Sequence, residues 1–250
     1  PVGERIVAQA QRVLEEASGI RQIARQGQNQ LDGPLRLGAI YTIGPYLLPH
    51  LIPQLAESAP KMPLIIEENY TASLADKLKQ GELDVILISL PFDEPGIKTL
   101  SLYREPFVLL IPSSHPLNQS TAVEIEDLGA EDVLLLGAGH CFRDQVLQVC
   151  PHCLPRGSAE AGRTQALDGG SLETIRYMVA SGLGVTILPC SAAGADRFSE
   201  RLLSIRRFNG DAPSRVVALA WRKSFPRPQA IEVLRDAVLS CEMSCVNPLN

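Results

Sequence analysis

The sequence predicts an α/β fold made of two Rossmann-like subdomains with a central cleft, preceded by one long helix. Hydrophobic residues make up 45% of the 250 residues and charged residues 20%, a balance typical of a globular chain. After Pro34, short apolar runs alternate with helix-like segments, which is the pattern of parallel βαβ units. This alternation passes through two successive sets, so each set is expected to form one lobe.

The long helix is predicted over residues 3–29. Its apolar residues recur at helical spacing, with Arg, Gln and Glu between them: Ile6, Val7, Ala10, Val13, Leu14, Ala17, Ile20 and Ile23. A lone amphipathic helix of this length needs a partner for its apolar stripe. Residues 1–30 are therefore interpreted as a linker or dimerisation helix, while packing of this helix on its own domain stays open.

The remaining elements follow in chain order. In the first lobe, strands alternate with helices at Leu35–Ile40, Pro45–Glu57, Pro63–Glu68, Ser73–Gln80 and Asp84–Ile88. The second lobe is expected to use Phe107–Ile111, Val133–Leu136, a helix from Cys141, Ser171–Ser181 and Val185–Leu188. A strand at Val216–Trp221 and a helix at Pro228–Ser240 return to the first lobe. The expected boundaries are 34–104 with 212–245 for subdomain I and 105–211 for subdomain II, with crossings near 103–106 and 208–213.

Two cysteines nine residues apart, Cys141 and Cys150, stand in a helix-like segment that follows a glycine turn. Along one helix, nine residues advance the chain by roughly 13.5 Å and about 900°, so the two side chains point to opposite faces. A disulfide needs Cα atoms within about 7 Å of each other. Joining this pair therefore requires the helix to unwind, which predicts a switch and not a staple. The alternative, two ordinary core cysteines, stays open.

Cys141 stands where a thiol readily becomes a thiolate. The first turn of a helix has unpaired backbone N–H groups and the positive end of the helix dipole, and both favour an anion. His140 and Arg143 add hydrogen-bond donors or positive charge nearby. Cys150 lies among apolar residues without such help, and it is interpreted as a buried resolving partner.

The segment Gly139-His140-Cys141-Phe142-Arg143-Asp144-Gln145, followed by Cys150, resembles the redox motif of the OxyR family of peroxide-sensing LysR-type transcription regulators. Three stretches resemble LysR-type regulators more widely: Thr42–Pro49, Ser171–Arg176 and Gly182–Val185. Pro1–Glu4 resembles the end of the DNA-binding domain in that family. The resemblance therefore extends over most of the chain.

This resemblance implies a fold like that of type 2 periplasmic binding proteins, acting as the regulatory domain of a peroxide-sensing regulator. Peroxide would oxidise Cys141, which would form a reversible disulfide with Cys150. The new bond would change the packing of the dimer or tetramer and activate antioxidant genes. Thr42, Thr71 and His140 match positions that hold the peroxide.

Further charged residues match supporting positions in the family. Arg215 matches a residue that stabilises the thiolate, and Arg143 and Asp144 match a charged pair that holds the reduced helix. From the residues alone, Thr42 and Thr71 are better interpreted as turn or N-cap residues, and an exposed surface charge stays open as the alternative for Arg215. Ala138 departs from the family pattern, in which an acidic residue is common at this position.

The resemblance also implies partners. The chain is expected to pair with itself as a homodimer, and as a tetramer in the full-length protein. Promoter DNA and RNA polymerase are expected to be reached only through the full-length protein, and a net charge of −5 gives these residues no electrostatic case for binding DNA. A thiol reductant such as glutaredoxin or thioredoxin would reset the switch. The reaction needs no metal and no cofactor beyond hydrogen peroxide as the reacting ligand.

The sequence also bears on the cellular compartment and on alternative functions. No apolar run reaches membrane-span length, and six cysteines are too sparse for a disulfide scaffold, so a reducing cytoplasm fits. A LysR-type domain that binds a small organic anion without redox chemistry is the alternative, and a thiol peroxidase or oxidoreductase is a third reading. An enzyme is not expected, because the C-x-x-C formed by Cys150 and Cys153 lacks the flanking strand and helix of such sites. Cys153 remains a potential competitor for Cys150, and Cys190, Cys241 and Cys245 are expected to be inert.

Overall fold

The computed structural model describes residues 30–153, 169–194, 201–243 and 245–249, together with Val2, Gly3, Ile6, Val7, Gln9, Ala10, Val13 and Ala17. These residues divide into two compact units. Unit 1 contains residues up to 102 and residues 217–242, and unit 2 contains residues 103–216 and 243–249. The chain passes between the units inside two strands, β4 (Ile97–Pro112) and β8 (Ser214–Arg222).

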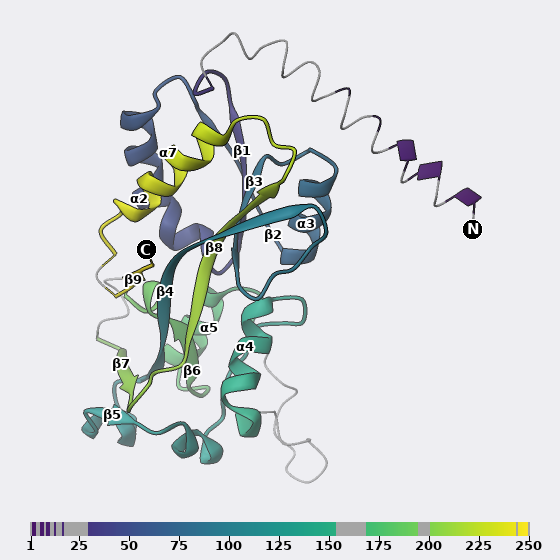
Figure 1. Cartoon of the computed structure of the whole chain (residues 1–250). Helices are drawn as coiled ribbons and strands as arrows, with labels where there is room; N and C mark the ends of the chain where they lie inside the picture. The colour runs from purple at the N-terminus through teal and green to yellow at the C-terminus, as the bar shows by residue number, and fades with distance from the viewer. Residues whose placement is uncertain are drawn as a thin grey trace. The chain divides into compact units, whose positions relative to one another are not determined.

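Unit 1 is built on parallel strands joined by helices (Figure 1). Strand β1 (Leu35–Ile40) pairs in parallel with β2 (Leu64–Asn69) on one edge and with β3 (Val85–Ser89) on the other. Helix α2 (Gly44–Ser58) connects β1 to β2, and α3 (Thr71–Lys79) connects β2 to β3. The two connections run in opposite directions across the sheet, so right-handed crossovers place α2 and α3 on opposite faces.

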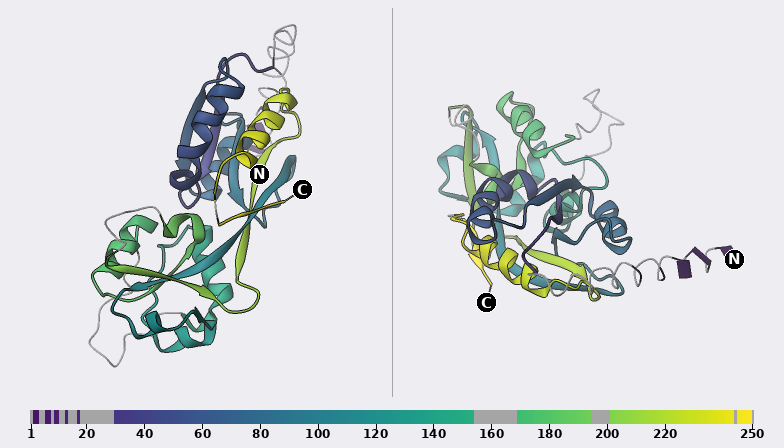
Figure 2. Two further views of the ribbon diagram at one scale, coloured as in Figure 1. Left: turned by 90° about the vertical axis from the view of Figure 1, so that its left-hand side faces the viewer. Right: turned by 90° about the horizontal axis from the view of Figure 1, so that it is seen from above.

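The last part of the chain completes unit 1. Strand β8 runs antiparallel to β3, with Val85 opposite Trp221 and Ser89 opposite Val217. Helix α7 (Pro228–Leu239) lies beside α2 (Figures 1 and 2). The sheet is tightly covered at Gly38 in β1, where a Cβ atom would lie 2.8 Å from side-chain carbons of Leu74 and Leu83. A glycine at that position therefore lets α3 approach the strand closely.

Unit 2 is a mixed sheet centred on β4. Strands β6 (Thr186–Pro189) and β7 (Leu203–Phe208) run antiparallel to β4, and β5 (Ala122–Val123) runs parallel to β7. The short strand β9 (Asn247–Pro248) pairs with β4 at Tyr103 and Arg104. The helices of this unit are α4 (Cys141–Val149), α5 (Leu172–Ala180) and α6 (Cys190–Ala193), with 3-10 turns η1 (Pro116–Gln119), η2 (Ile125–Ala130) and η3 (Pro151–Cys153).

The predicted α/β fold with two successive βα sets is confirmed, with three local differences. Residues 133–136 do not form the predicted strand, because only Val133 and Leu136 make single parallel bridges, to Val185 and Gly169. The crossing expected near 103–106 falls at the boundary between the units, but it lies inside the continuous strand β4, which begins at Ile97 and not at Phe107. Strands β5, β7 and β9 were not predicted from the sequence, since the first and last have only two residues and show no periodicity.

The predicted helix of residues 3–29 lies largely outside the described residues. The described positions within it are helical, and the apolar side chains of Val2, Ile6, Val7 and Val13 are exposed on it. In the part of the chain that the structure describes, no helix combines the length and the hydropathy that crossing a bilayer requires.

Candidate functional site

The switch segment, defined as residues 139–153, begins as the sequence predicts. Gly139 has a φ of +96°, a conformation that side chains with a Cβ atom rarely adopt, and it turns the chain into the helix. His140 is the N-cap residue and Cys141 is the first residue of α4. Phe142 and Val146 are buried on the inner face of the helix, whereas Cys141 is partly exposed. The cysteine therefore stands at the positive end of the helix within reach of solvent.

Hydrogen bonds fix the entry to α4. The Arg143 guanidinium donates to the backbone carbonyl of Leu136 at 2.5 Å, which ties the helix to the segment that precedes it. His140 is buried, and this burial lowers its pKa although a backbone hydrogen bond with Gly170 acts in the opposite direction. The imidazole is therefore neutral at physiological pH. The sequence left open whether His140 supplies a donor or a charge, and burial disfavours the charge.

The inner face of α4 packs on an aromatic and cationic cluster. The Phe142 ring meets the Phe107 ring edge-on, with centroids 5.1 Å apart. The guanidinium carbon of Arg215 lies 5.5 Å from the centroid of the same ring, a cation–π arrangement. Arg215 is buried, so the alternative that it is an exposed surface charge is wrong. Its contact with the residue next to Cys141 links β8 to the start of α4.

The cysteine pairing differs from the one suggested by the sequence. Cys141 is free, and Cys150, the C-cap residue of α4, forms a disulfide with Cys153. The two Cα atoms are 5.3 Å apart, and α4 is complete while this bond is present. Cys150 is buried, as predicted, and Cys153 is its partner in this state. The bond between Cys141 and Cys150 stays a prediction for the peroxide-oxidised form.

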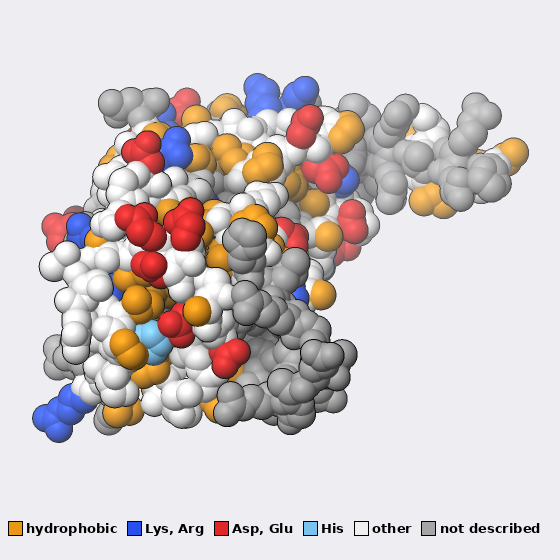
Figure 3. All heavy atoms as spheres, turned by 90° about the horizontal axis from the view of Figure 1, so that it is seen from below, with side chains coloured by type: hydrophobic (Ala, Val, Ile, Leu, Met, Phe, Trp, Pro, Cys, Tyr) orange, Lys and Arg blue, Asp and Glu red, His pale blue; other side chains and the backbone are white. Residues whose placement is uncertain are grey.

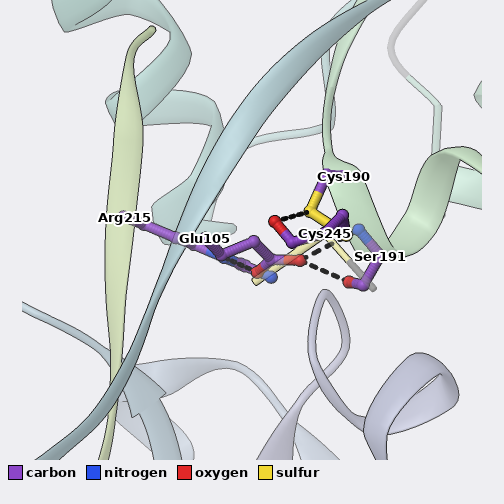
Figure 4. Close-up of a disulfide and its surroundings, with 5 residues drawn as sticks. All are labelled: Glu105, Cys190, Ser191, Arg215 and Cys245. Carbon is purple, nitrogen blue, oxygen red and sulfur yellow. Dashed lines mark hydrogen bonds and ion pairs between the residues drawn. A yellow bond between two sulfur atoms is a disulfide. The ribbon is translucent and has the colours of Figure 1, made fainter. Parts of the chain in front are cut away.

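A second disulfide lies in a group of residues that we name the anchor cluster: Glu105, Cys190, Ser191, Arg215 and Cys245 (Figure 4). The Cys190–Cys245 disulfide joins the first residue of α6 to the C-terminal segment, with Cα atoms 6.1 Å apart. The expectation that these two cysteines are inert is therefore wrong. Cys241 is free and partly buried, and burial raises the pKa of its thiol.

The anchor cluster also holds a buried ion pair. The Arg215 Nε atom donates to Glu105 Oε2 at 2.7 Å, and both side chains are almost fully buried. The other carboxylate oxygen accepts hydrogen bonds from the backbone N–H of Ser191, at 3.1 Å, and from the Ser191 hydroxyl. The cluster connects the residue beside the disulfide, through Glu105 and Arg215, to the Phe142 ring of α4.

No local sequence pattern identifies Glu105 as a functional residue. Glu105 is separated from Arg215 by 110 positions, and it lies inside a strand made mostly of apolar residues. A buried carboxylate in a strand requires a cationic partner, but no local spacing identifies which arginine supplies it. The pairing of Cys190 with Cys245 is equally non-local, with a sequence separation of 55.

The remaining predicted site residues are Thr42, Thr71 and Asp144. Thr42 follows β1 and is buried, and Thr71 is the first residue of α3; both belong to unit 1, whereas Cys141 belongs to unit 2. Their shared contact with peroxide stays a prediction. Asp144 lies exposed on α4. Among the described side chains, no three His, Cys, Asp or Glu residues gather closely enough to hold a metal ion.

Comparison with known protein families identifies the family of this chain. The family described as the LysR substrate binding domain matches residues 28–240. The chain belongs to this family. Curated relatives include a probable hydrogen peroxide-inducible genes activator of Streptomyces viridosporus, 37% identical over 95% of this chain and 75% of the relative. The DNA-binding transcriptional dual regulator OxyR of Escherichia coli K12 is 34% identical over 94% of this chain and 75% of its own length.

Solved structures agree with the curated relatives. A full-length OxyR variant from Pseudomonas aeruginosa is 53% identical, with a TM-score of 0.83, over 97% of this chain and 76% of that structure. The reduced regulatory domain of OxyR from Pseudomonas aeruginosa is 52% identical, with a TM-score of 0.77, over 85% of this chain and all of that domain. This chain is therefore similar to these structures in both fold and amino-acid sequence.

Proposed function

We propose that this chain is the regulatory domain of a transcription regulator that senses hydrogen peroxide through Cys141. The observation that carries the proposal is the position of this cysteine, which is free, partly exposed and the first residue of α4. The peroxide-inducible activators and OxyR structures among its relatives support the same function. Such a domain reacts with peroxide as a signal, so the protein is a regulator and not an enzyme.

The first step oxidises Cys141. The helix N-terminus favours the thiolate, which attacks one oxygen of hydrogen peroxide and breaks the O–O bond. The products are a sulfenic acid on Cys141 and hydroxide, which takes up a proton and leaves as water. His140 is the residue before the reacting cysteine, and it is proposed to hold the peroxide together with Thr42 and Thr71. No other cofactor is involved in this step.

The second step uses Cys150 as the resolving thiol. Its thiol condenses with the sulfenic acid, forming the Cys141–Cys150 disulfide with loss of one water, after α4 has unwound. Because Cys150 is bonded to Cys153 in the structure, the step requires the dithiol form of that pair. A thiol reductant such as glutaredoxin or thioredoxin must therefore reduce Cys150–Cys153 before the chain can sense peroxide.

The supporting residues act on the helix. Arg143 holds the start of α4 to Leu136, and Arg215 holds Phe142 from the inner side. Unwinding α4 breaks both contacts, so the oxidised segment repacks against a different surface. We propose that this change is passed to subunit packing through self-association of the chain, in which the exposed apolar side chains Ile6, Val7 and Val13 take part.

The decisive experiment is the reaction of the reduced chain with peroxide, followed by stopped flow. Cys141→Ser is expected to abolish the fast reaction, because the thiolate is the reacting form. Cys241→Ser is the matched control: Cys241 is also free, but its buried thiol stays protonated, so its loss should leave the rate unchanged. An unchanged rate in the Cys141→Ser variant would refute the proposal.

DNA is proposed to bind through other parts of the full-length regulator, and RNA polymerase to be contacted there too. On the face drawn in Figure 3, acidic side chains are spread among uncharged ones and basic side chains lie toward the edges. The net charge of the chain is −5. A surface of this kind repels the phosphate backbone. Action on promoter DNA inside the cytoplasm, without a membrane, fits this division of labour.

A second candidate function is the binding of a small organic anion without redox chemistry. The Thr71 hydroxyl, at the start of α3, is buried and has no hydrogen-bond partner among the described residues. A ligand oxygen at this helix N-terminus would supply one. The HTH-type transcriptional regulator EstR of Acinetobacter baylyi is also 34% identical, and its name does not mention peroxide. Calorimetric titration of Cys141→Ser with carboxylates tests this candidate, and Thr71→Val should remove any binding found.

A further inference from the structure

Cys150 has two cysteines that it can bond, and they make different demands on the fold. Cys153 lies in η3, immediately after α4, and its backbone N–H donates to the Cys150 carbonyl at 3.0 Å. The turn therefore holds the two cysteines together, with Cα atoms 5.3 Å apart. Cys141 lies at the opposite end of α4, about 13 Å of helix axis away.

The two bonds differ in what they cost the helix. In the structure α4 runs unbroken from Cys141 to Val149 while Cys150 is bonded to Cys153. The bond between Cys141 and Cys150 requires that same helix to unwind, which gives up its backbone hydrogen bonds and the burial of Phe142 and Val146. Of the two disulfides, only the one with Cys153 is compatible with the packed switch segment.

Burial protects the bond with Cys153 from the outside. Cys150 is 1% exposed and Cys153 is 4% exposed, so a bulky external thiol cannot reach either sulfur in the packed state. Cys153, in contrast, stays three residues from Cys150 in every state of the chain. An attached thiol of this kind acts at an effective concentration of roughly millimolar or more.

We infer that Cys153 is a third member of the switch, which displaces Cys141 from the Cys141–Cys150 disulfide. The inference rests on the proposed function for the origin of that disulfide. The Cys153 thiolate attacks the sulfur of Cys150, the bond between Cys141 and Cys150 breaks, and Cys141 leaves as a thiolate. Cys150 remains a disulfide sulfur throughout, Cys153 is oxidised from a thiolate to a disulfide sulfur, and Cys141 is reduced to a thiolate. No further oxidant or reductant takes part.

The exchange gives the regulator a timed signal. Immediately after peroxide, Cys141–Cys150 is closed and α4 is unwound; after exchange, Cys150–Cys153 is closed and α4 refolds with Cys141 free. The refolding of α4 favours the exchange over its reverse. The chain then returns to the helical arrangement without external reductant, but it cannot resolve a second sulfenic acid until Cys150–Cys153 is reduced. The structure corresponds to this exchanged state.

Disulfide mapping by mass spectrometry tests the inference. The fully reduced chain receives one equivalent of peroxide. Samples are taken over time, quenched with acid and then alkylated. In the wild type, Cys141–Cys150 should rise and then fall as Cys150–Cys153 rises. In Cys153→Ser, Cys141–Cys150 should persist at least about tenfold longer, given the effective concentration of an attached thiol. Cys241→Ser, which removes a cysteine of unit 1, should behave as the wild type.

Equal persistence of Cys141–Cys150 in the wild type and in Cys153→Ser would overturn the inference. A separate arm replaces peroxide with one equivalent of diamide, which oxidises any dithiol and so does not depend on peroxide sensing. The wild type should then settle with Cys150–Cys153 as the dominant bond of the switch segment, and dominance of Cys141–Cys150 would overturn the inference. Failure of Cys141 to react with peroxide, with the expected diamide result, would instead refute the proposed function.

Discussion

The two disulfides of unit 2 close loops of very different length. Cys150 and Cys153 are three residues apart, in one turn at the end of α4. Cys190 and Cys245 are 55 residues apart, and they tie α6 to the segment that carries β9. The first bond has a competing thiol, Cys141, on the same helix. The second is next to a buried ion pair and has no free cysteine in its own unit other than Cys141.

Loop length separates a staple from a switch. In the entropic model, a bond that closes a loop of 55 residues constrains the unfolded chain by about 4 kcal/mol, whereas a loop of three or four residues gives about 2 kcal/mol or less. The Cys190–Cys245 bond therefore stabilises unit 2 strongly, and the Cys150–Cys153 bond is available for exchange at little loss of stability. The predictions below test this contrast between the anchor cluster and the switch segment.

The largest effect is expected from Glu105→Gln in the anchor cluster. The substitution keeps the volume of the side chain but removes the carboxylate charge that pairs with the buried Arg215 guanidinium. Breaking a buried pair in this way costs about 3–5 kcal/mol. Urea unfolding followed by a probe in unit 2 measures the loss. Ser191→Ala is the matched control, because it removes only a hydroxyl hydrogen bond to Glu105 and should cost about 1 kcal/mol.

A double variant sharpens this result. Glu105→Met combined with Arg215→Met removes both charges and should recover much of the stability lost in Glu105→Gln, since replacing a whole buried pair by apolar side chains is often near neutral. If the double variant is as unstable as Glu105→Gln, the ion pair is not the source of the loss. The peroxide rate of the double variant also tests whether Arg215 supports the Cys141 thiolate.

The next effect is expected from Cys245→Ser, which opens the Cys190–Cys245 disulfide. Unit 2 should lose about 2–4 kcal/mol, because the unfolded chain regains the freedom of the 55-residue loop. Urea titrations of oxidised samples measure the difference. Under reducing conditions the wild type and Cys245→Ser should become nearly equal in stability. A difference that survives reduction would mean that the Cys245 side chain stabilises by packing instead.

A smaller effect is expected from Cys153→Ser in the switch segment. The loss in oxidised samples should be about 2 kcal/mol or less, since so short a loop restricts the unfolded chain little. The same titration applies, and Cys241→Ser again serves as the control. A loss as large as that of Cys245→Ser would contradict the distinction between the two bonds.

The sequence predicts local features of this molecule well and distant pairings poorly. The bounds of β1, the start of α4 at Cys141 and the glycine turn before it follow from periodicity and capping rules that act within a few residues. The partners of Glu105 and Cys190 are 110 and 55 positions away, and only the folded sheet brings them together. The sequence indicates Cys153 as a competitor for Cys150. The Cys150–Cys153 disulfide itself depends on the turn η3, which brings the two residues together.

The smallest expected effect separates the two regions by pH. Burial lowers the pKa of His140 in the folded chain below the value of about 6.5 that the residue has when unfolded. Above that value His140 is neutral in both states and its contribution to stability is complete. As the pH falls below about 6.5, the unfolded chain binds a proton first, so stability falls until the pH passes the folded pKa.

This pH dependence belongs to the switch segment, because His140 occupies the N-cap position of α4 and hydrogen-bonds with the backbone of Gly170. Urea unfolding of unit 2 at pH 7.5 and at pH 5.5 should show a larger loss in the wild type than in His140→Gln, which cannot take up the proton. The exposed His50 of α2 provides the control, since His50→Gln should keep the pH dependence of the wild type. Equal slopes in His140→Gln and the wild type would assign the acid sensitivity to other groups. The stability of unit 2 would then not depend on the protonation of His140, which precedes the proposed reacting residue Cys141.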